Sequence, residues 1–536
     1  MDGFNNSAVK TTIFLLLFVL TTFFGIPQNP NQDDNPKVTR VTILNADSAT
    51  VMQNKNPDKI LYGNVIFFHD SIFMYCDSAY MFSLLNSFEA FDNVKIIQGD
   101  TLFIYSDYMV YYANDQLAKM RNNVKMEDKD VTLFTDSFDY DRKNQLAYYF
   151  NGGMIVDSAN ELTSVYGQYS PETKKAFFKD KVKLINPDLV LTSDTLNYDA
   201  ETKIATIVSP SVIETDSGFV YSSQGWYNTV SDESMLYNRS LIVSKDSAKT
   251  ITADSIFYNR KDGIVVAFGN MILNDTVQKV IVMGNYGYYD EKNDYAFATD
   301  SAKIIEYSQS DSSYIHADTI IMRTIDSIRE VKAYYGVRLW RTDLQGVCDS
   351  LKYNTSDSIL RLYKTPIIWN EAFQITGDTI NILFNDSTIE RMHVLNYAFA
   401  LEKIDSTYYN QLKGRNMTFL FDEGELYEIG VEGNGETIYY NIDDKDAAPL
   451  QLNKISSPFF IFSINLRKIS RLKAYPESET DVVPIPDLTP ELKFLPNFVD
   501  YNYIRPKDKD DIFAKSVMKT EDIPPPRRTR QRSQQE

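Results

Sequence analysis

A short sequence element recurs about every 30 residues, and this repeat constrains the fold more than any other feature. Its marker is an Asp followed by Ser or Thr in a similar setting, at Asp47, Asp77, Asp136, Asp194, Asp254, Asp318, Asp349 and Asp378. Related copies with one altered position are centred on Asp107, Gly167, Gln224, Asn285 and Gly414. About thirteen such units fill residues 38–440. Because a unit this short cannot enclose its own core, the units are predicted to stack and to bury their faces against one another.

Each unit is predicted to contain two β-strands joined by turns. In the unit marked by Asp194, the apolar residues Leu196 and Tyr198 follow at the spacing of one face of a strand. Clusters of Asp, Asn, Lys and Gly, such as residues 290–294, then favour a turn. The 36 Tyr and 32 Phe residues also favour half-buried sheet surfaces. The predicted fold class is all-β, an elongated solenoid of about thirteen repeats of about 30 residues.

The apolar pattern changes phase at the marker Asp. Upstream, the apolar residues lie three and one positions before the Asp, whereas downstream they lie two and four positions after it. A straight strand cannot change phase without turning its apolar face outward, so a bend or bulge is predicted at each marker. A carboxylate there can accept hydrogen bonds from backbone amides that the bend leaves free. We therefore interpret the recurrent Asp as a structural residue of the bend, and not as a catalyst or ligand.

The two cysteines, Cys76 and Cys348, both lie immediately before a marker Asp. Nine units separate them, which corresponds to at least about 43 Å at one strand of about 4.8 Å per unit. A disulfide requires Cα atoms within about 7 Å of each other. The stacked arrangement therefore predicts that these cysteines do not form an intramolecular disulfide.

Three regions outside residues 38–440 differ from the repeat. Residues 1–26 place a basic residue before an apolar run, which is typical of a signal peptide or, if uncleaved, of an N-terminal anchor. Residues 441–475 contain an apolar segment followed by basic residues, and are predicted to cap the array or to dock on a membrane or partner. Residues 476–536 are rich in proline and are predicted to form a disordered tail.

Charge and residue inventory argue against several functions. A net charge of −19 disfavours binding to nucleic acid. The histidines His69, His316 and His393 show no metal-binding spacing with the cysteines, and no nucleophile elbow or phosphate-binding glycine loop occurs. We expect neither catalysis nor a cofactor. An enzyme on this scaffold would need carboxylates that align on one exposed face.

The units share the pattern A-D-S/T-x-x-Y, a turn, and then N-V-x-apolar. It reads DSAYMF at 77–82 with NVKI at 93–96, and ADSIFYN at 253–259, while residues 63–65 read Gly-Asn-Val. This pattern resembles the OstA-like, LptA-type family of lipopolysaccharide-transport proteins, which includes a periplasmic bridge protein and the N-terminal domain of the outer-membrane translocon. The resemblance covers roughly residues 38–440. It implies a β-jellyroll whose facing sheets hold the acyl chains of lipopolysaccharide, and envelope partners that join end to end by strand addition.

On this resemblance, the expected function is to bind lipopolysaccharide and pass it towards the outer membrane. The expected location is the periplasm, with membrane association through an uncleaved N-terminal segment or an outer-membrane partner as an alternative. The predicted groove lining consists of inward residues on three strands. These residues are Ala118, Met120, Val124, Met126, Ala147, Tyr149, Ala176, Phe178, Val182 and Leu184.

Two questions stay open at the level of sequence. The same inward residues are also consistent with a closed core, which would make the chain a structural or adhesion solenoid without a lipid ligand. Lys179, Lys181 and Lys183 alternate on the polar face of one strand, where they could meet ligand phosphates or simply face solvent.

Overall fold

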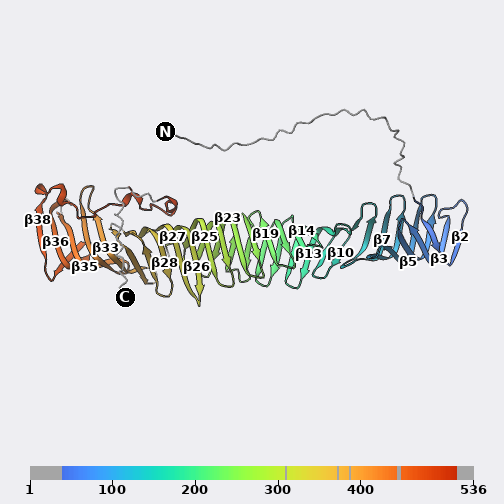
Figure 1. The fold of residues 1–536 in the computed structure, drawn as a ribbon, viewed down its shortest axis with the longest axis horizontal. Coiled ribbons are helices and arrows are strands. Elements are labelled where there is room, and N and C mark those ends of the chain that lie inside the picture. Colours follow the sequence, from blue (N-terminus) through green and yellow to red (C-terminus); the bar gives the residue numbers. More distant parts are fainter. Residues whose placement is uncertain are drawn as a thin grey trace, which may run out of the picture.

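The computed structural model of the protein describes residues 39–307, 311–370, 373–385, 388–442, 448–466, 468–515 and 519. Within these residues, 38 strands form one continuous sheet, and hydrogen-bonded neighbours run antiparallel. The body is elongated, with β2 at one end and β38 at the other (Figure 1). This confirms the predicted all-β fold class. The predicted signal peptide or anchor, residues 1–26, lies outside the described residues.

Two kinds of strand build the sheet. The long strands are β3 (Lys59–His69), β4 (Ile72–Phe82), β5 (Ser87–Gln98), β6 (Leu102–Tyr112), β7 (Leu117–Asp128), β8 (Val131–Asp141), β13 (Lys175–Asn186), β14 (Leu189–Asp199), β23 (Ile264–Asp275), β24 (Val280–Asp290), β25 (Tyr295–Glu306), β26 (Ser313–Ile325), β27 (Ile328–Arg341), β28 (Leu344–Asn354), β33 (Thr388–Lys403), β34 (Tyr409–Asp422), β35 (Glu425–Ile442) and β36 (Pro449–Asn465).

Elsewhere two short strands, one after the other, take the place of one long strand. These pairs are β1 (Thr42–Asn45) with β2 (Ser48–Val51), β9 (Leu146–Tyr149) with β10 (Gly153–Val156), β11 (Glu161–Ser164) with β12 (Tyr166–Ser170), β15 (Ile204–Ile207) with β16 (Ser211–Thr215), β17 (Gly218–Ser222) with β18 (Gln224–Asn228), β19 (Glu233–Tyr237) with β20 (Leu241–Ser244), β21 (Lys249–Thr252) with β22 (Ser255–Asn259), β29 (Ile359–Tyr363) with β30 (Ile367–Asn370), β31 (Phe373–Thr376) with β32 (Thr379–Asn385), and β37 (Lys468–Tyr475) with β38 (Glu479–Pro484).

Each long strand has an irregularity near its middle, and in many of these strands the marker Asp or the Asn of the Asn-Val motif lies there. The register between β4 and β5 shifts between Tyr75 and Ser78, next to Asp77. On β5 the opposing residue Asn93 has a φ of 50°, and its amide donates a hydrogen bond of 2.7 Å to the Asp77 carboxylate. The same Asn-to-Asp bond recurs from Asn123 to Asp107. The predicted bend and the structural role of the marker Asp are thus confirmed.

Glycine precedes some of these asparagines for a steric reason. Gly63 has a φ of 73°, and a Cβ at this position would collide with the carboxylate of Asp47. Gly269 has a φ of 72° and stands in the same relation to Asp254. The left-handed backbone and the close approach together require glycine, because it has no Cβ.

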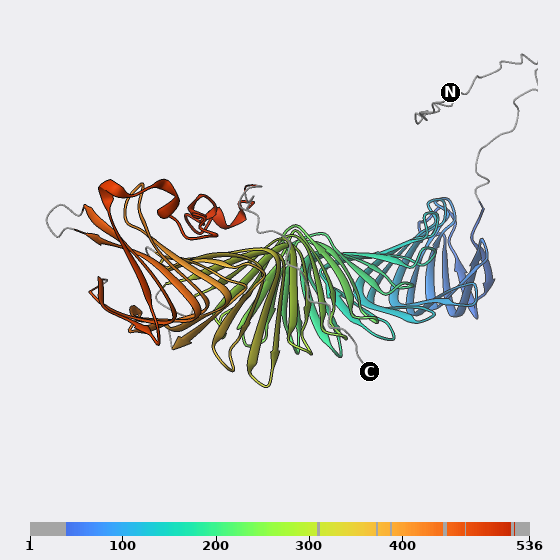
Figure 2. The same ribbon diagram turned by 60° about the vertical axis from the view of Figure 1, so that its left-hand side comes forward.

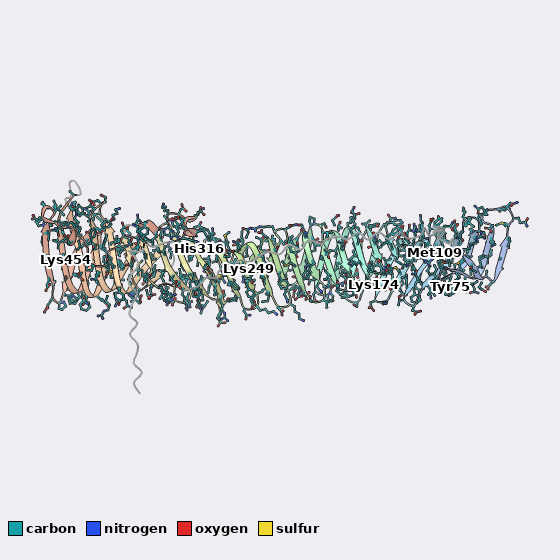
Figure 3. The ribbon with its side chains drawn as sticks, turned by 45° about the horizontal axis from the view of Figure 1, so that its top comes forward. Tyr75, Met109, Lys174, Lys249, His316 and Lys454 are labelled. Atoms are coloured by element: carbon teal, nitrogen blue, oxygen red, sulfur yellow. The ribbon has the colours of Figure 1, made fainter. Side chains whose placement is uncertain are left out.

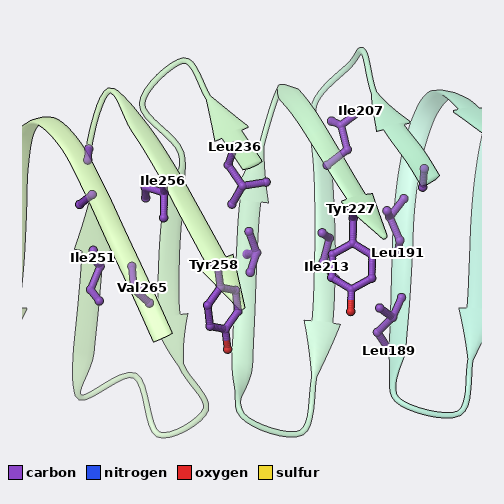
Figure 4. Packing of buried hydrophobic residues seen from close by; sticks show 14 of the residues in the cluster. Leu189, Leu191, Ile207, Ile213, Tyr227, Leu236, Ile251, Ile256, Tyr258 and Val265 are labelled. Carbon is purple, nitrogen blue, oxygen red and sulfur yellow. The ribbon is translucent and has the colours of Figure 1, made fainter. Parts of the chain in front are cut away.

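The bends divide the sheet into two layers that face each other. Layer A contains β2, β9, β12, β15, β18, β19, β22, β29, β32 and β37, and layer B contains β1, β10, β11, β16, β17, β20, β21, β30, β31 and β38. Each long strand passes through both layers. Inward side chains from both layers form one apolar cluster that extends from Val41 to Phe462 (Figure 4). Cys76 and Cys348 are buried in this cluster and are both free, which confirms the absence of a disulfide between them.

The C-terminal region extends the array beyond the repeat pattern. β36, β37 and β38 continue the sheet beyond residue 440, because the inward positions Phe460 and Phe462 keep the apolar alternation. Residues 485–515 were predicted to belong to a disordered tail, but they cross the outer face of layer B, and we call them the strap (Figure 2). The strap contains the 3-10 turns η1 (Ile485–Asp487), η2 (Pro490–Leu492), η3 (Asn502–Ile504) and η4 (Asp511–Phe513).

The strap is ordered because the array supplies both apolar and polar partners. Leu495 and Ile504 are buried in two small clusters on layer B, the second of which includes Trp369. The side-chain amide of Gln411 donates to the carbonyl of Lys493 and accepts from the amide of Leu495. Proline-rich composition therefore did not prevent order here, since fixed partners replace the regular ladder.

Candidate functional site

All ten predicted lining residues point into the interior between the layers. Ala176 is the most exposed of them at 7%, and Met120, Met126 and Phe178 are fully buried. They lie on β7, β9 and β13, which are close together in the stack. The predicted inward register of these strands is therefore confirmed. That these residues bind a ligand stays a prediction.

The interior around these residues is filled with side chains. The ring of Tyr149 lies so close to Gly153 and Gly167 that a Cβ at either glycine would collide with it. The Tyr149 hydroxyl is 2.6 Å from the hydroxyl of Ser164, and burial raises the pKa of Tyr149 to about 12. A hollow of about 600 Å³ beside Ala176 is lined mainly by outward side chains of layer A, such as Gln168 and Phe177. Further along the array, a cavity beside Val220 and Ile251 measures about 40 Å³, which is far smaller than a usual ligand pocket of about 300 Å³ or more. A ligand inside this part would have to separate the layers.

The edges of the two layers meet on the side opposite the bends. Here the turns at the ends of layer A strands face the turns at the ends of layer B strands, and we call this boundary the mouth. A row of inward tyrosines on layer A follows the mouth with a spacing of 29 to 31 residues. The row comprises Tyr111, Tyr140, Tyr169, Tyr198, Tyr227, Tyr258 and Tyr289. In Figure 4 the hydroxyls of Tyr227 and Tyr258 point towards the turns.

Polar groups of layer B form hydrogen bonds with these tyrosines across the mouth. The Tyr111 hydroxyl lies 2.8 Å from Nδ1 of the buried His69, and the Tyr140 hydroxyl donates to Gln98 at 3.1 Å. The Tyr169 hydroxyl donates to Asp128 at 3.0 Å. Each bond joins residues 41 or 42 positions apart, so it links strands that are not neighbours in the ladder.

Cations of layer A complete several of these contacts. Lys174 forms an ion pair with Asp128, and the Nζ of Lys203 lies 2.9 Å from the carboxylate of Asp157. Both carboxylates are nearly fully buried, with side chains 2% exposed, whereas both lysines are 21–24% exposed. Figure 3 labels Lys174 and Lys249, which lie well apart along the body.

The same arrangement continues with other residue types towards the middle of the array. Arg260 contacts Asp232 at 2.8 Å on layer A and Asp216 at 3.1 Å on layer B. Lys249 of layer B donates to Tyr289 at 3.0 Å and to Asp294 at 2.6 Å. We call these tyrosines, their layer B partners and the bridging cations the polar seam.

Burial and charge shift the ionisation of seam residues. Burial raises the pKa of Tyr140 to about 12, and it raises the pKa of Tyr169 further because the Asp128 carboxylate lies beside that hydroxyl. For Asp157, burial opposes ionisation, but bonds from the Ala159 amide, Lys203 and Tyr198 outweigh it and lower the pKa. At neutral pH Tyr140 and Tyr169 are therefore neutral, and the Asp157 carboxylate is ionised.

Mild acid is expected to destabilise the N-terminal end of the array. Burial lowers the pKa of His69 below its usual value of 6.5. Stability from neutral His69 is therefore fully present above pH 6.5 and is lost as the pH falls through the lower, folded-state pKa. Hydrogen exchange of β3 and β6, followed between pH 7.5 and 5, measures this loss of stability. In His69→Gln the stability of these strands is expected to depend less on pH. An equally steep profile in that variant would contradict the assignment to His69, since burial also lowers the pKa of His316 and His393.

The seam was not found by reading the sequence, although a signal exists. Tyrosines 29 residues apart are visible in the repeat, and Gln98, Asp128 and Asp157 precede their tyrosines by 41 or 42 positions. That offset has meaning only once the two layers are known to meet at the mouth. Lys179, Lys181 and Lys183, the lysines that could meet ligand phosphates, are exposed on the outer surface at and beside the bend.

The described residues contain neither a membrane-spanning helix nor a metal-binding cluster. Over those ranges, the chain has no helix long and apolar enough to cross a membrane. In the same part of the chain, no group of three or more His, Cys, Asp or Glu side chains is arranged to hold a metal ion.

Comparisons with known proteins agree with the repeat pattern. The family model of the OstA-like protein matches residues 38–194. Among solved structures, the chain is similar to LptH from Pseudomonas aeruginosa, described as the LptA homologous periplasmic component of the conserved lipopolysaccharide transport device. That match has 10% identity, covers 26% of this chain and 93% of LptH, and has a TM-score of 0.20. No curated protein matches the sequence. Residues 38–194 are thus identified as OstA-like in sequence.

Proposed function

We propose that this protein binds lipopolysaccharide in the periplasm, with the acyl chains between layers A and B, and passes it towards the outer membrane. The observation that carries the proposal is the apolar interior, which continues without a break from Val41 to Phe462 in an OstA-like chain. Burial in such an interior stabilises a bound acyl chain by about 0.8 kcal/mol for each methylene group. The chain is proposed to act by binding and transfer, without catalysis.

The two ends of the sheet support end-to-end contacts with envelope partners. In the described residues, β1 and β2 pair only with β3, and β37 and β38 pair only with β36. The outer edges of these four strands thus have no further strand beside them in the described residues, and such edges can accept a strand from another protein. We propose that partners of the transport pathway join there.

One observation favours a second candidate function. Tyr149 and Phe178 are fully buried against neighbouring side chains, as in the core of a closed solenoid. A structural or adhesion protein of the envelope would need no space between the layers. The two candidates differ in whether a lipid ever contacts the inward side chains.

Photocrosslinking in cells distinguishes them. A photoreactive amino acid at Met120 or Phe178 is expected to give lipopolysaccharide adducts, because both side chains point into the interior. The matched control is Lys119, the neighbour of Met120 on the same strand, which points outward and is expected to give none. Adducts at Lys119 equal to those at Met120 would indicate surface contact only. Absence of adducts at every inward position, in folded protein, would support the closed solenoid.

A further inference from the structure

The cations of the polar seam have two properties that a purely structural ion pair does not require. They lie at the mouth, where an amphiphile held between the layers would place its headgroup, and they remain partly exposed while their carboxylate partners are buried. Lys174 and Lys203 are 29 residues apart and occupy the same position in successive units. The mouth therefore presents two ammonium groups, one unit apart, in this part of the array.

The seam also closes the interior. Tyr169 and Lys174 of layer A both bind Asp128 of layer B, and Tyr198 and Lys203 both bind Asp157. To insert an acyl chain beside Ala147, which pairs with Tyr169 on the neighbouring strand, these contacts must break. Breaking them leaves both charges without a partner. Separation of the layers opens the carboxylate to water, but a ligand that enters the mouth covers the lysine, and a covered charge without a partner is costly. A ligand that supplies its own anion at the mouth removes this cost, whereas a neutral ligand does not.

We propose that the polar seam is an anion-selective opening of the interior, at which a phosphate-bearing headgroup replaces Asp128 and Asp157 as the partner of Lys174 and Lys203. The ligand class is an amphiphile with apolar chains and an anionic headgroup. This inference rests on the proposed function, because it assumes that acyl chains enter between the layers. It specifies which residues select the headgroup, and it specifies where the two layers separate.

The test measures the width of the mouth with two spin labels. Asp130→Cys on the layer B turn and Glu172→Cys on the layer A turn place exposed labels on either side of the contact between Lys174 and Asp128. The native thiols need no replacement, since Cys76 and Cys348 are buried and burial raises the pKa of the Cys76 thiol to about 12. The control pair, Glu172→Cys with Glu201→Cys, has both labels on layer A turns.

Dodecyl phosphate and dodecyl maltoside, each below its micellar concentration, are the probes, because they share one alkyl chain and differ in headgroup charge. Dodecyl phosphate is expected to lengthen the distance across the mouth in a saturable way and to leave the control pair unchanged. Dodecyl maltoside is expected to bind at least about tenfold more weakly, in line with one charge-assisted contact. Lys174→Gln is expected to weaken dodecyl phosphate about tenfold without affecting the maltoside, and Lys174→Arg to restore the response.

The outcomes separate this inference from the proposed function. If both amphiphiles bind and widen the mouth equally, or if Lys174→Gln responds like the unaltered chain, the anion-selective seam is wrong and lipid binding stands. If neither amphiphile binds in a chain whose control distance is native, the proposed function fails as well. A changed control distance in Lys174→Gln would indicate misfolding, and the comparison then rests on Lys203→Gln with labels at Ser158 and Glu201, which flank its own contact with Asp157.

Discussion

Chains that end at Pro484 are expected to lose stability in the C-terminal half of the array and to self-associate. The strap buries Leu495, Ile504 and Ile512, and each such side chain contributes about 1.5–3 kcal/mol when it is buried. Its removal also breaks the hydrogen bonds between the side-chain amides of Gln374 and Gln411 and the strap backbone, each of which contributes about 0.5–1.5 kcal/mol. The uncovered face around Trp369 is apolar, and exposed apolar patches promote association.

Thermal unfolding and sedimentation velocity of the truncated and full-length chains measure this effect. A chain that ends at Lys515 keeps the strap, and is expected to behave like the full chain. Within the strap, Leu495→Ala is expected to cost about 2–5 kcal/mol, whereas Leu492→Ala, at an exposed position, is expected to have little effect. A truncated chain that stays monomeric with unchanged unfolding would show that the strap contacts contribute nothing to stability.

Phe178→Asp is expected to unfold the units around β13, and Phe177→Asp is its matched control. Phe178 is fully buried between the layers, while its neighbour Phe177 points outward and is half-buried. Loss of the buried ring alone costs about 3–5 kcal/mol, and an unpaired carboxylate in the interior adds to this. The Phe177 substitution places the same charge on the outer surface, where water solvates it.

Hydrogen exchange followed by mass spectrometry locates this effect along the chain. Because each unit contacts mainly its neighbours, loss of protection in Phe178→Asp is expected to centre on β12–β14 and to fade towards both ends. Equal loss of protection in the two variants would contradict the inward register. Uniform loss over the whole array would instead show that the units unfold as one cooperative body.

The repeat made the main features of the fold predictable. The phase change at Asp77 indicated a bend, and the structure has a register shift there together with a hydrogen bond from Asn93. The alternation on β7 likewise placed Met120 and Met126 inside. These predictions succeeded because a period of two residues and a fixed unit length translate directly into which face of a strand is buried.

The polar seam and the strap escaped prediction for a different physical reason. The bond between Tyr169 and Asp128 joins the ends of two layers, and its offset of 41 residues depends on how sharply the strands bend. The strap has no β-ladder with the array. Its backbone is instead bonded at separate points by the side-chain amides of Gln374 and Gln411. Local patterns of hydrophobicity carry no information about contacts of either kind.

The direction of the strands has a mechanical consequence. Strands cross the long axis of the body, so the ladder bonds between them run along that axis and are loaded in series when the two ends are pulled apart (Figure 1). Under such tension a plain stack would peel one strand at a time. The bond from Tyr169 on β12 to Asp128 on β7 spans strands that share no ladder, as does the ion pair from Lys203 to Asp157. Such links distribute a pulling force over several strands, and a chain pulled at its two ends would resist peeling over the length that the seam covers.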